Sequence, residues 1–183
     1  MLVLHGILAR RGALNIGAYG PLVDRAMAAA AKPGHLVLDI ESPGGSPVQS
    51  DLIAARIRRG AEKHKVKVTA VIGEVGASGG YWLACAADRI VANPMSIVGS
   101  IGVVSGGFGF EAALFDGGFM LGARALEHGL IDGLGDVAGL VRELGGEKAV
   151  AQMFGPRRRG LLARLPRLLA EAEGELRGPR LEV

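Results

Sequence analysis

Small residues surround Ser78 in the run Val75-Gly-Ala-Ser-Gly-Gly-Tyr-Trp-Leu-Ala-Cys-Ala-Ala87. The alternating apolar residues before it, 66–73, predict a strand, and the apolar residues after it predict a helix. A serine at such a strand-to-helix turn can be exposed at a sheet edge, close to the free N–H groups of the helix start. The pattern therefore suits a serine nucleophile beside an oxyanion site. The alternative is a glycine-rich turn that only permits close packing.

A second stretch, Ser42-Pro-Gly-Gly-Ser46, offers the backbone N–H groups of Gly44 and Gly45. Together with the N–H of Gly79, they could form an oxyanion hole around a carbonyl that Ser78 attacks. Losing one such donor typically costs about 2.7–4 kcal/mol of transition-state stabilisation. A plain Pro-Gly turn is the simpler interpretation. The same N–H groups could also bind a thioester enolate or a phosphate without any nucleophile.

Alternating strands and helices are expected to position these two stretches. The sequence predicts strands at 1–8, 35–40, 66–73 and 88–92, and helices at 21–32, 47–64, after Ser78 and at 137–144. This alternation favours an α/β fold with a largely parallel sheet. Active crevices in such sheets lie beyond the carboxyl ends of the strands. The 42–46 loop and the Ser78 turn should therefore meet in one crevice.

The composition fits one domain with an aliphatic core. The chain has 183 residues, of which 49% are hydrophobic and only 4% aromatic, and its formal charge of +3 is too small to argue for nucleic-acid binding. Cys85 is the only cysteine, which excludes an internal disulfide, and we expect it to be a small core residue. We expect no metal and no cofactor. Because we find no signal peptide and no long apolar run, we expect a soluble, cytoplasmic chain.

Four ordered motifs resemble the signal peptide peptidase A and SohB-like family of serine peptidases, which has the ClpP/crotonase fold. They are Ser42-Pro-Gly-Gly-Ser46, Gly76-Ala-Ser-Gly-Gly-Tyr81, Ala86-Ala-Asp-Arg-Ile-Val-Ala92 and Val98-Gly-Ser-Ile-Gly-Val103. The resemblance covers residues 1 to about 111 and resumes over 115–132. It implies a largely parallel sheet built from repeated β-β-α and βα units.

The resemblance also implies a role for each site residue. Ser78 matches the nucleophile, while Gly79 and the pair Gly44 and Gly45 match the oxyanion-hole backbone. Ser100 matches a serine that helps to orient a lysine general base. Family members cleave signal peptides or other small or unfolded polypeptides, and they assemble as homo-oligomers with the active sites inside.

The family's lysine has no clear counterpart in this sequence. In relatives it follows the Gly-Ser-Ile-Gly motif, but here several dozen residues are absent near 112–114, and the only later lysine, Lys148, does not match. Three explanations remain: a natural, inactive deletion, a segment missing from this sequence, or another base. The histidines, less favoured as that base, are His5, His35, His64 and His128.

We therefore expect a peptidase domain at 1–150 and a basic amphipathic tail at 151–183. The tail could contact an anionic membrane or a neighbouring subunit, although a loosely docked terminal helix is the simpler interpretation. Three functions compete. They are a Ser–Lys serine endopeptidase, an inactive peptidase-like binding or assembly subunit, and a crotonase-like acyl-CoA enzyme.

Overall fold

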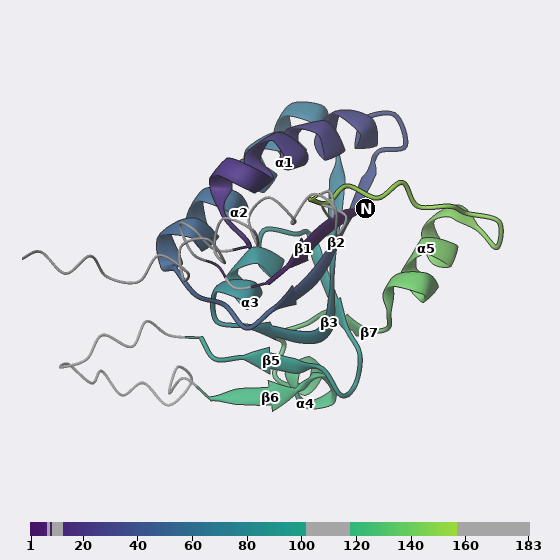
Figure 1. The fold of residues 1–183 in the computed structure, drawn as a ribbon. Coiled ribbons are helices and arrows are strands. Elements are labelled where there is room, and N and C mark those ends of the chain that lie inside the picture. Colours follow the sequence, from purple (N-terminus) through teal and green to yellow (C-terminus); the bar gives the residue numbers. More distant parts are fainter. Residues whose placement is uncertain (7, 9–12, 102–117, 157–183) are drawn as a thin grey trace, which may run out of the picture.

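The computed structural model describes residues 1–6, 8, 13–101 and 118–156, which form a seven-stranded sheet with helices on both faces (Figure 1). Five strands follow the order β1-β2-β3-β4-β7, and β5 and β6 branch from β3. Every pairing is parallel except that of β5 with β6. The predicted α/β fold with a largely parallel sheet is confirmed.

The strands that carry the sheet are short at its edges and long at its centre. They are β1 (Leu2–His5), β2 (His35–Ser42), β3 (Lys67–Ala77), β4 (Arg89–Ala92), β5 (Ile97–Gly99), β6 (Phe119–Leu121) and β7 (Gly133–Leu134). The predicted strands at 35–40, 66–73 and 88–92 correspond to β2, β3 and β4. β5 lies in a stretch for which the sequence predicted neither a strand nor a helix.

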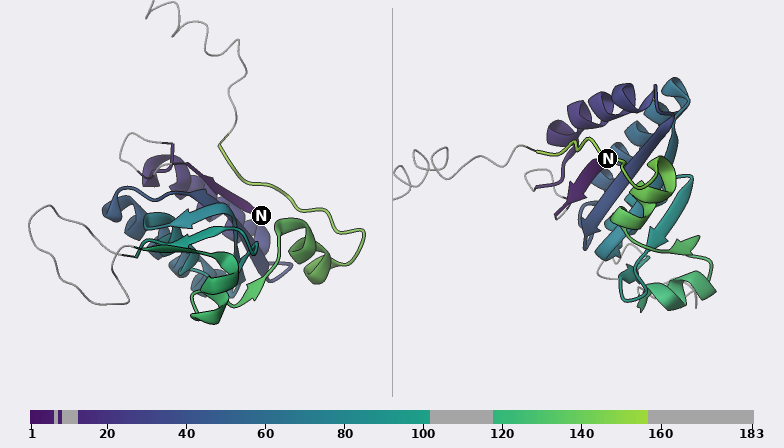
Figure 2. Two further views of the ribbon diagram at one scale, coloured as in Figure 1. Left: turned by 90° about the horizontal axis from the view of Figure 1, so that it is seen from below. Right: turned by 90° about the vertical axis from the view of Figure 1, so that its right-hand side faces the viewer.

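The helices are α1 (Ile16–Ala30), α2 (Pro47–His64), α3 (Gly79–Ala84), α4 (Gly122–Glu127) and α5 (Val137–Gly145). The helices α1, α2 and α3 lie on one face of the sheet and α5 lies on the other, an arrangement that the two views of Figure 2 allow the reader to follow. Alternate residues of the central strands point to opposite faces. Accordingly, Leu36 and Leu38 join the core under α1 and α2, whereas Val37 packs with Val71 and Leu140 of α5.

α1 begins five residues before the predicted start, which corrects the loop expected up to Gly20. The side chain of Asn15 accepts a hydrogen bond from the Ala18 N–H, which caps the helix. Pro21 therefore lies inside the helix and not in its first turn. The fully buried Tyr19 ties the additional turn to the core.

The helix after Ser78 is only six residues long, and Cys85 caps its end. Cys85 is exposed, so the predicted core position for this residue is wrong. The thiol leaves the core because the chain turns after Ala84 toward Asp88, whose N–H donates to the carbonyl of Val68.

Residues 152–154 run alongside the edge strand β1. The Met1 amine donates to the Gln152 carbonyl, and the Phe154 N–H donates to the Met1 carbonyl. The expected chain junction at 112–114, and the tail from residue 157 on, lie outside the described residues. None of the helices in the described ranges combines the length and the apolar character needed to cross a bilayer.

Candidate active site

Ser78 occupies a strained turn between β3 and α3. Its backbone angles are φ 52° and ψ −121°, a conformation that residues with a side chain rarely adopt. The Ser78 N–H donates to the Gly99 carbonyl at 2.8 Å, so the turn is tied to the neighbouring strand β5. A serine held in such a strand-to-helix turn has the geometry of a nucleophile elbow.

The structure brings Ser100 next to Ser78. Ala77 of β3 is in register with Gly99 of β5, and each serine follows its strand by one residue. Adjacent strands lie about 4.8 Å apart, so the two serines leave the sheet side by side. Ser100 shares the unusual backbone, with φ 51°, and its N–H donates to the Gly118 carbonyl at 2.6 Å.

The 42–46 loop packs directly against the Ser78 turn, as the sequence predicted. A Cβ atom added to Gly44 would lie 2.7 Å from the Ser78 Cβ and 2.8 Å from the Gly79 nitrogen. One added to Gly80 would collide with the Ser42 carbonyl oxygen. The glycines on both sides therefore allow the two backbones to approach each other.

The two glycines of this loop are not equivalent as donors. The Gly44 N–H is already engaged, because it donates to the Ser42 Oγ at 3.2 Å, and that hydroxyl donates to the Gly6 carbonyl at 2.7 Å. Within the described residues, the N–H groups of Gly45 and Gly79 have no such internal partner. The pair that remains for an oxyanion is Gly45 and Gly79.

A pocket of about 420 Å³ opens beside these groups. Its wall is mainly apolar, with Pro47, Trp82 and Ile101 among the lining side chains. The full lining is Gly45, Pro47, Ser50, Ser78, Gly79, Tyr81, Trp82, Cys85 and Ile101. A serine hydroxyl, two backbone N–H groups and an apolar wall are the components that acyl transfer to serine would require here, apart from a base.

All lysines and histidines of the sequence fall within the described ranges, and none of them lines this pocket. His5 instead lies 3.2 Å from Asp39, and His35 lies 3.0 Å from the Thr69 hydroxyl. Lys65 caps the end of α2. The five lysines are Lys32, Lys63, Lys65, Lys67 and Lys148.

Two titratable side chains do line the pocket, but both stay protonated near pH 7. Cys85 is exposed as a residue, but partial desolvation of its thiol raises the pKa of that group above its ordinary value of 9.0. Burial also raises the pKa of the Tyr81 phenol, which donates a hydrogen bond to the Leu130 carbonyl at 2.6 Å. Neither group is therefore a general base at neutral pH.

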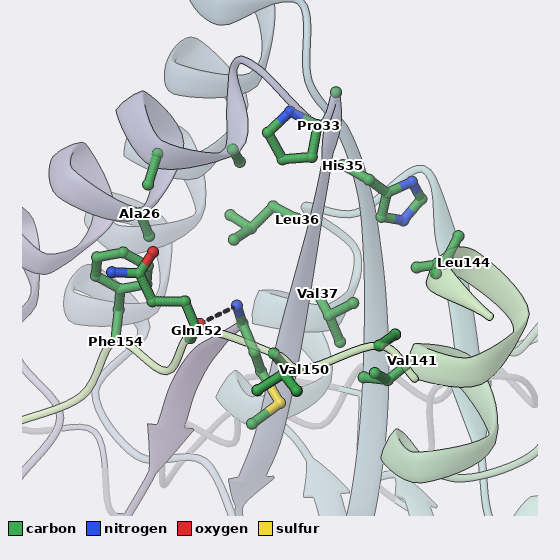
Figure 3. Close-up of a pocket in the computed structure, with 17 residues that line it drawn as sticks. Ala26, Pro33, His35, Leu36, Val37, Val141, Leu144, Val150, Gln152 and Phe154 are labelled. Carbon is green, nitrogen blue, oxygen red and sulfur yellow. Dashed lines mark hydrogen bonds between the residues drawn. The ribbon is translucent and has the colours of Figure 1, made fainter. Parts of the chain in front are cut away.

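Two other hollows carry none of the predicted site residues. One, of about 490 Å³, lies between α1, the start of β2 and residues 149–154 and is largely aliphatic (Figure 3). The other, of about 630 Å³, lies near the start of α5. Both are larger than the pocket at Ser78, but neither places a nucleophile beside free N–H groups.

Comparison with known proteins points to the same residues. Residues 60–118, which contain Ser78 and Ser100, match the model of peptidase family S49. The probable protease SohB of Haemophilus influenzae is 42% identical over 71 residues, covering 39% of this chain and 20% of that protein. The chloroplastic serine protease SPPA of Arabidopsis thaliana is 44% identical over 72 residues, covering 39% of this chain and 10% of that protein.

The segment that contains Ser78 and Ser100 is thus similar to peptidase family S49 and to the proteases SohB and SPPA. The mixed α/β architecture with its largely parallel sheet agrees with the ClpP/crotonase-like fold of family S49. The predicted resemblance is confirmed at this level. The roles of Ser78, Ser100 and the glycines remain predictions.

A longer match joins this chain to a protein of Brucella melitensis named Na(+)/H(+) antiporter NhaA. It is 32% identical over 224 residues and covers 88% of this chain but 30% of that protein. The chain thus spans less than a third of the length of these relatives. The aligned stretch is longer than the 183 residues of the chain itself, so the Brucella protein has positions without a counterpart here.

Sequence reasoning missed three contributors to the site. Ser50 is buried and lines the pocket, one turn after Ser46 on α2. Its position could have been predicted, since residues four apart share a helix face. Glu41 and Ser96, which bind the backbone of β3, gave no local signal because their partners are more than 20 residues away.

Proposed function

We propose that this chain carries the nucleophile and the oxyanion site of a Ser–Lys serine endopeptidase. The observation that carries the proposal is the strained Ser78, set beside Ser100 and in contact with the 44–45 turn. The S49 match over 60–118 and the protease relatives support the same reaction class.

The proposed reaction is acyl transfer to the Ser78 hydroxyl. The Oγ atom bonds to the carbonyl carbon of a peptide while its proton passes to a base. The N–H groups of Gly45 and Gly79 donate to the oxyanion that forms. The C–N bond then breaks, the amine leaves with the proton, and water hydrolyses the ester by the same steps.

The proposed base is a lysine that this sequence does not contain. In the relatives that the motifs resemble, the lysine follows Gly-Ser-Ile-Gly, and the Brucella alignment includes positions absent here. A buried lysine can be neutral near pH 7 and accept the serine proton. Without it Ser78 is a weak nucleophile, so we expect slow acylation by this chain alone.

A second candidate function is a non-catalytic binding or assembly subunit. The observation that favours it is the pocket itself, since none of its described lining residues is a lysine or histidine. The acyl-CoA alternative is less supported, because none of those residues is a carboxylate that could act as its base. The match to the Brucella melitensis protein does not support an antiporter function for this chain, because it covers only 30% of that protein.

The substrates and the homo-oligomeric state are proposed from the resemblance, whereas the membrane contact is proposed from the basic amphipathic pattern of the tail. We propose signal peptides or other small or unfolded polypeptides as substrates, a homo-oligomeric assembly, and a membrane contact through residues 151–183 in a cytoplasmic protein. Sedimentation tests the oligomeric assembly, and flotation with anionic vesicles tests the membrane contact.

Chemical rescue separates the two candidate functions. The purified chain is treated with a fluorophosphonate in increasing concentrations of propylamine, a soluble stand-in for the lysine amine, and its intact mass is recorded. We expect an adduct on Ser78 that forms faster as the free amine increases, and no adduct in Ser78→Ala. Complete absence of an adduct at every amine concentration would identify the binding-subunit function instead.

A further inference from the structure

The central strand β3 changes partners on its way to Ser78. Residues 69–72 pair with β4, whereas residues 75–77 pair with β5. The backbone between these two segments leaves the regular ladder, and its polar groups need other partners because unpaired buried groups are costly. Two side chains, from Glu41 and Ser96, supply them.

Glu41 provides the acceptors. Its Oε2 accepts from the Glu74 N–H at 2.7 Å, and its Oε1 accepts from the Val75 N–H at 2.9 Å. The ladder between β2 and β3 is irregular between Ile40 and Ser42, where this side chain projects. A Cβ atom on Gly73 would collide with the same carboxylate, so a glycine there leaves it room.

Ser96 provides the donor. Its side chain is buried, and its hydroxyl donates to the Gly73 carbonyl at 2.5 Å, with the Ile72 carbonyl further away at 3.3 Å. Glu41 and Ser96 thus bind donors and acceptors of the same short stretch of β3, residues 72–75, from two different segments. We refer to these two side chains as the β3 clamp.

The β3 clamp joins the three segments that form the site. Glu41 directly precedes the 42–46 loop, and Ser96 directly precedes β5, which leads to Ser100. Both side chains bind β3, the strand that leads to Ser78. We infer that Glu41 and Ser96 are positioning residues for acyl transfer, holding the bend in β3 that sets Ser78 beside Ser100 and the oxyanion loop. The kinetic part of this inference rests on the proposed function, whereas its structural part does not.

Amide hydrogen exchange tests the structural part in the full chain. In Glu41→Ala, we expect faster exchange at the Glu74 and Val75 amides and also at the Ser78 amide, which bonds to Gly99. Glu41→Gln keeps one acceptor oxygen and should lie between Glu41→Ala and the wild type. Glu62→Gln, on the exposed side of α2, makes the same charge change and should leave all three amides unaltered.

Ser78 labelling in propylamine tests the kinetic part. Small misplacements can cost up to about a hundredfold in rate, so we expect a tenfold to hundredfold slower maximal rate in Glu41→Ala and Ser96→Ala. The fluorophosphonate concentration for half-maximal rate should change little, because the pocket wall is intact. Glu41→Gln should recover part of the rate.

The outcomes distinguish this inference from the proposed function. If Ser78 is never labelled, the proposed function fails, but the exchange result still decides whether the clamp holds the turn. If exchange in Glu41→Gln, Glu41→Ala and Ser96→Ala rises only at residues 74 and 75, or not at all, the positioning role is overturned. A labelling rate in these variants equal to that of Glu62→Gln would overturn it as well.

Discussion

Ser78 combines two properties that normally exclude each other, a side chain and a backbone with positive φ. The sequence predicted a serine at a strand-to-helix turn, but not the strain, because the angle is imposed by the pairing of β3 with β5 and by the contact with Gly44. Strained residues of this kind typically cost about 1–3 kcal/mol and occur where function requires them.

Replacing Ser78 by glycine should therefore stabilise the fold while removing the proposed nucleophile. We expect Ser78→Gly to unfold with a free energy about 1 kcal/mol above that of Ser78→Ala, because glycine adopts positive φ without a steric cost. Urea denaturation of the two variants measures the difference. Equal stabilities would show that the turn is not strained.

Gly44 should tolerate no side chain, because a Cβ atom there would clash with the Ser78 turn in addition to straining the backbone at positive φ. We expect Gly44→Ala to cost more than about 2 kcal/mol and to slow Ser78 labelling, because the new Cβ would displace the Ser78 and Gly79 backbone. Gly34→Ala is the matched control. It also has positive φ but open space around it, so it should cost only about 1–2 kcal/mol and leave labelling unchanged.

His35 should make stability depend on pH. Burial lowers its pKa from the ordinary value of 6.5, so between the folded value and 6.5 the unfolded chain binds more protons. This stabilising contribution is present above pH 6.5 and is lost as the pH falls through the folded value. The melting temperature should fall on acidification below pH 6.5, and less steeply in His35→Asn. If the melting temperature depended on pH equally in the wild type and in His35→Asn, the role of His35 in this pH dependence would be contradicted.

At the scale of helices and strands, local signals predicted α2 well and α1 poorly. α2 has the predicted bounds because Ser46 and Pro47 mark its start, and because the spacing of apolar residues changes from helical to alternating before β3. The start of α1 depends on the Asn15 cap and on the buried Tyr19. Pro21 was a misleading start signal, because tertiary packing outweighs the hydrogen bond that a proline inside a helix loses.

The end of α2 offers a stabilising substitution remote from the site. Lys65 closes the helix in the left-handed conformation, with φ 54° and ψ 43°, where glycine is normally favoured. We expect Lys65→Gly to increase the free energy of unfolding by about 0.5–1 kcal/mol. The urea midpoint measures this gain, and the rate of Ser78 labelling should stay unchanged. A lower midpoint would mean that the lysine side chain contributes contacts of its own.

At the scale of the whole molecule, the parallel sheet and the meeting of the two glycine-rich turns could be predicted from the alternation of elements. The division of β3 between β4 and β5 could not, because the strand reads as one apolar run through residue 73 and nothing local marks the change of partner. The hydrogen bond of the Gly44 N–H could not be predicted either, because the Ser42 hydroxyl that accepts it is held by the carbonyl of the distant Gly6.

The antiparallel pairing of Gly99 with Phe119 has a consequence for how this lineage changes over time. Because β5 and β6 pair at these residues, the ends of the connection between them lie close together, and connections of different length can join them. A gene could therefore lose or regain a stretch at this point in a single event while the descendant still folds. On the proposed function, the fold and the catalytic base can therefore be inherited separately, because a change in this connection leaves the Ser78 turn intact.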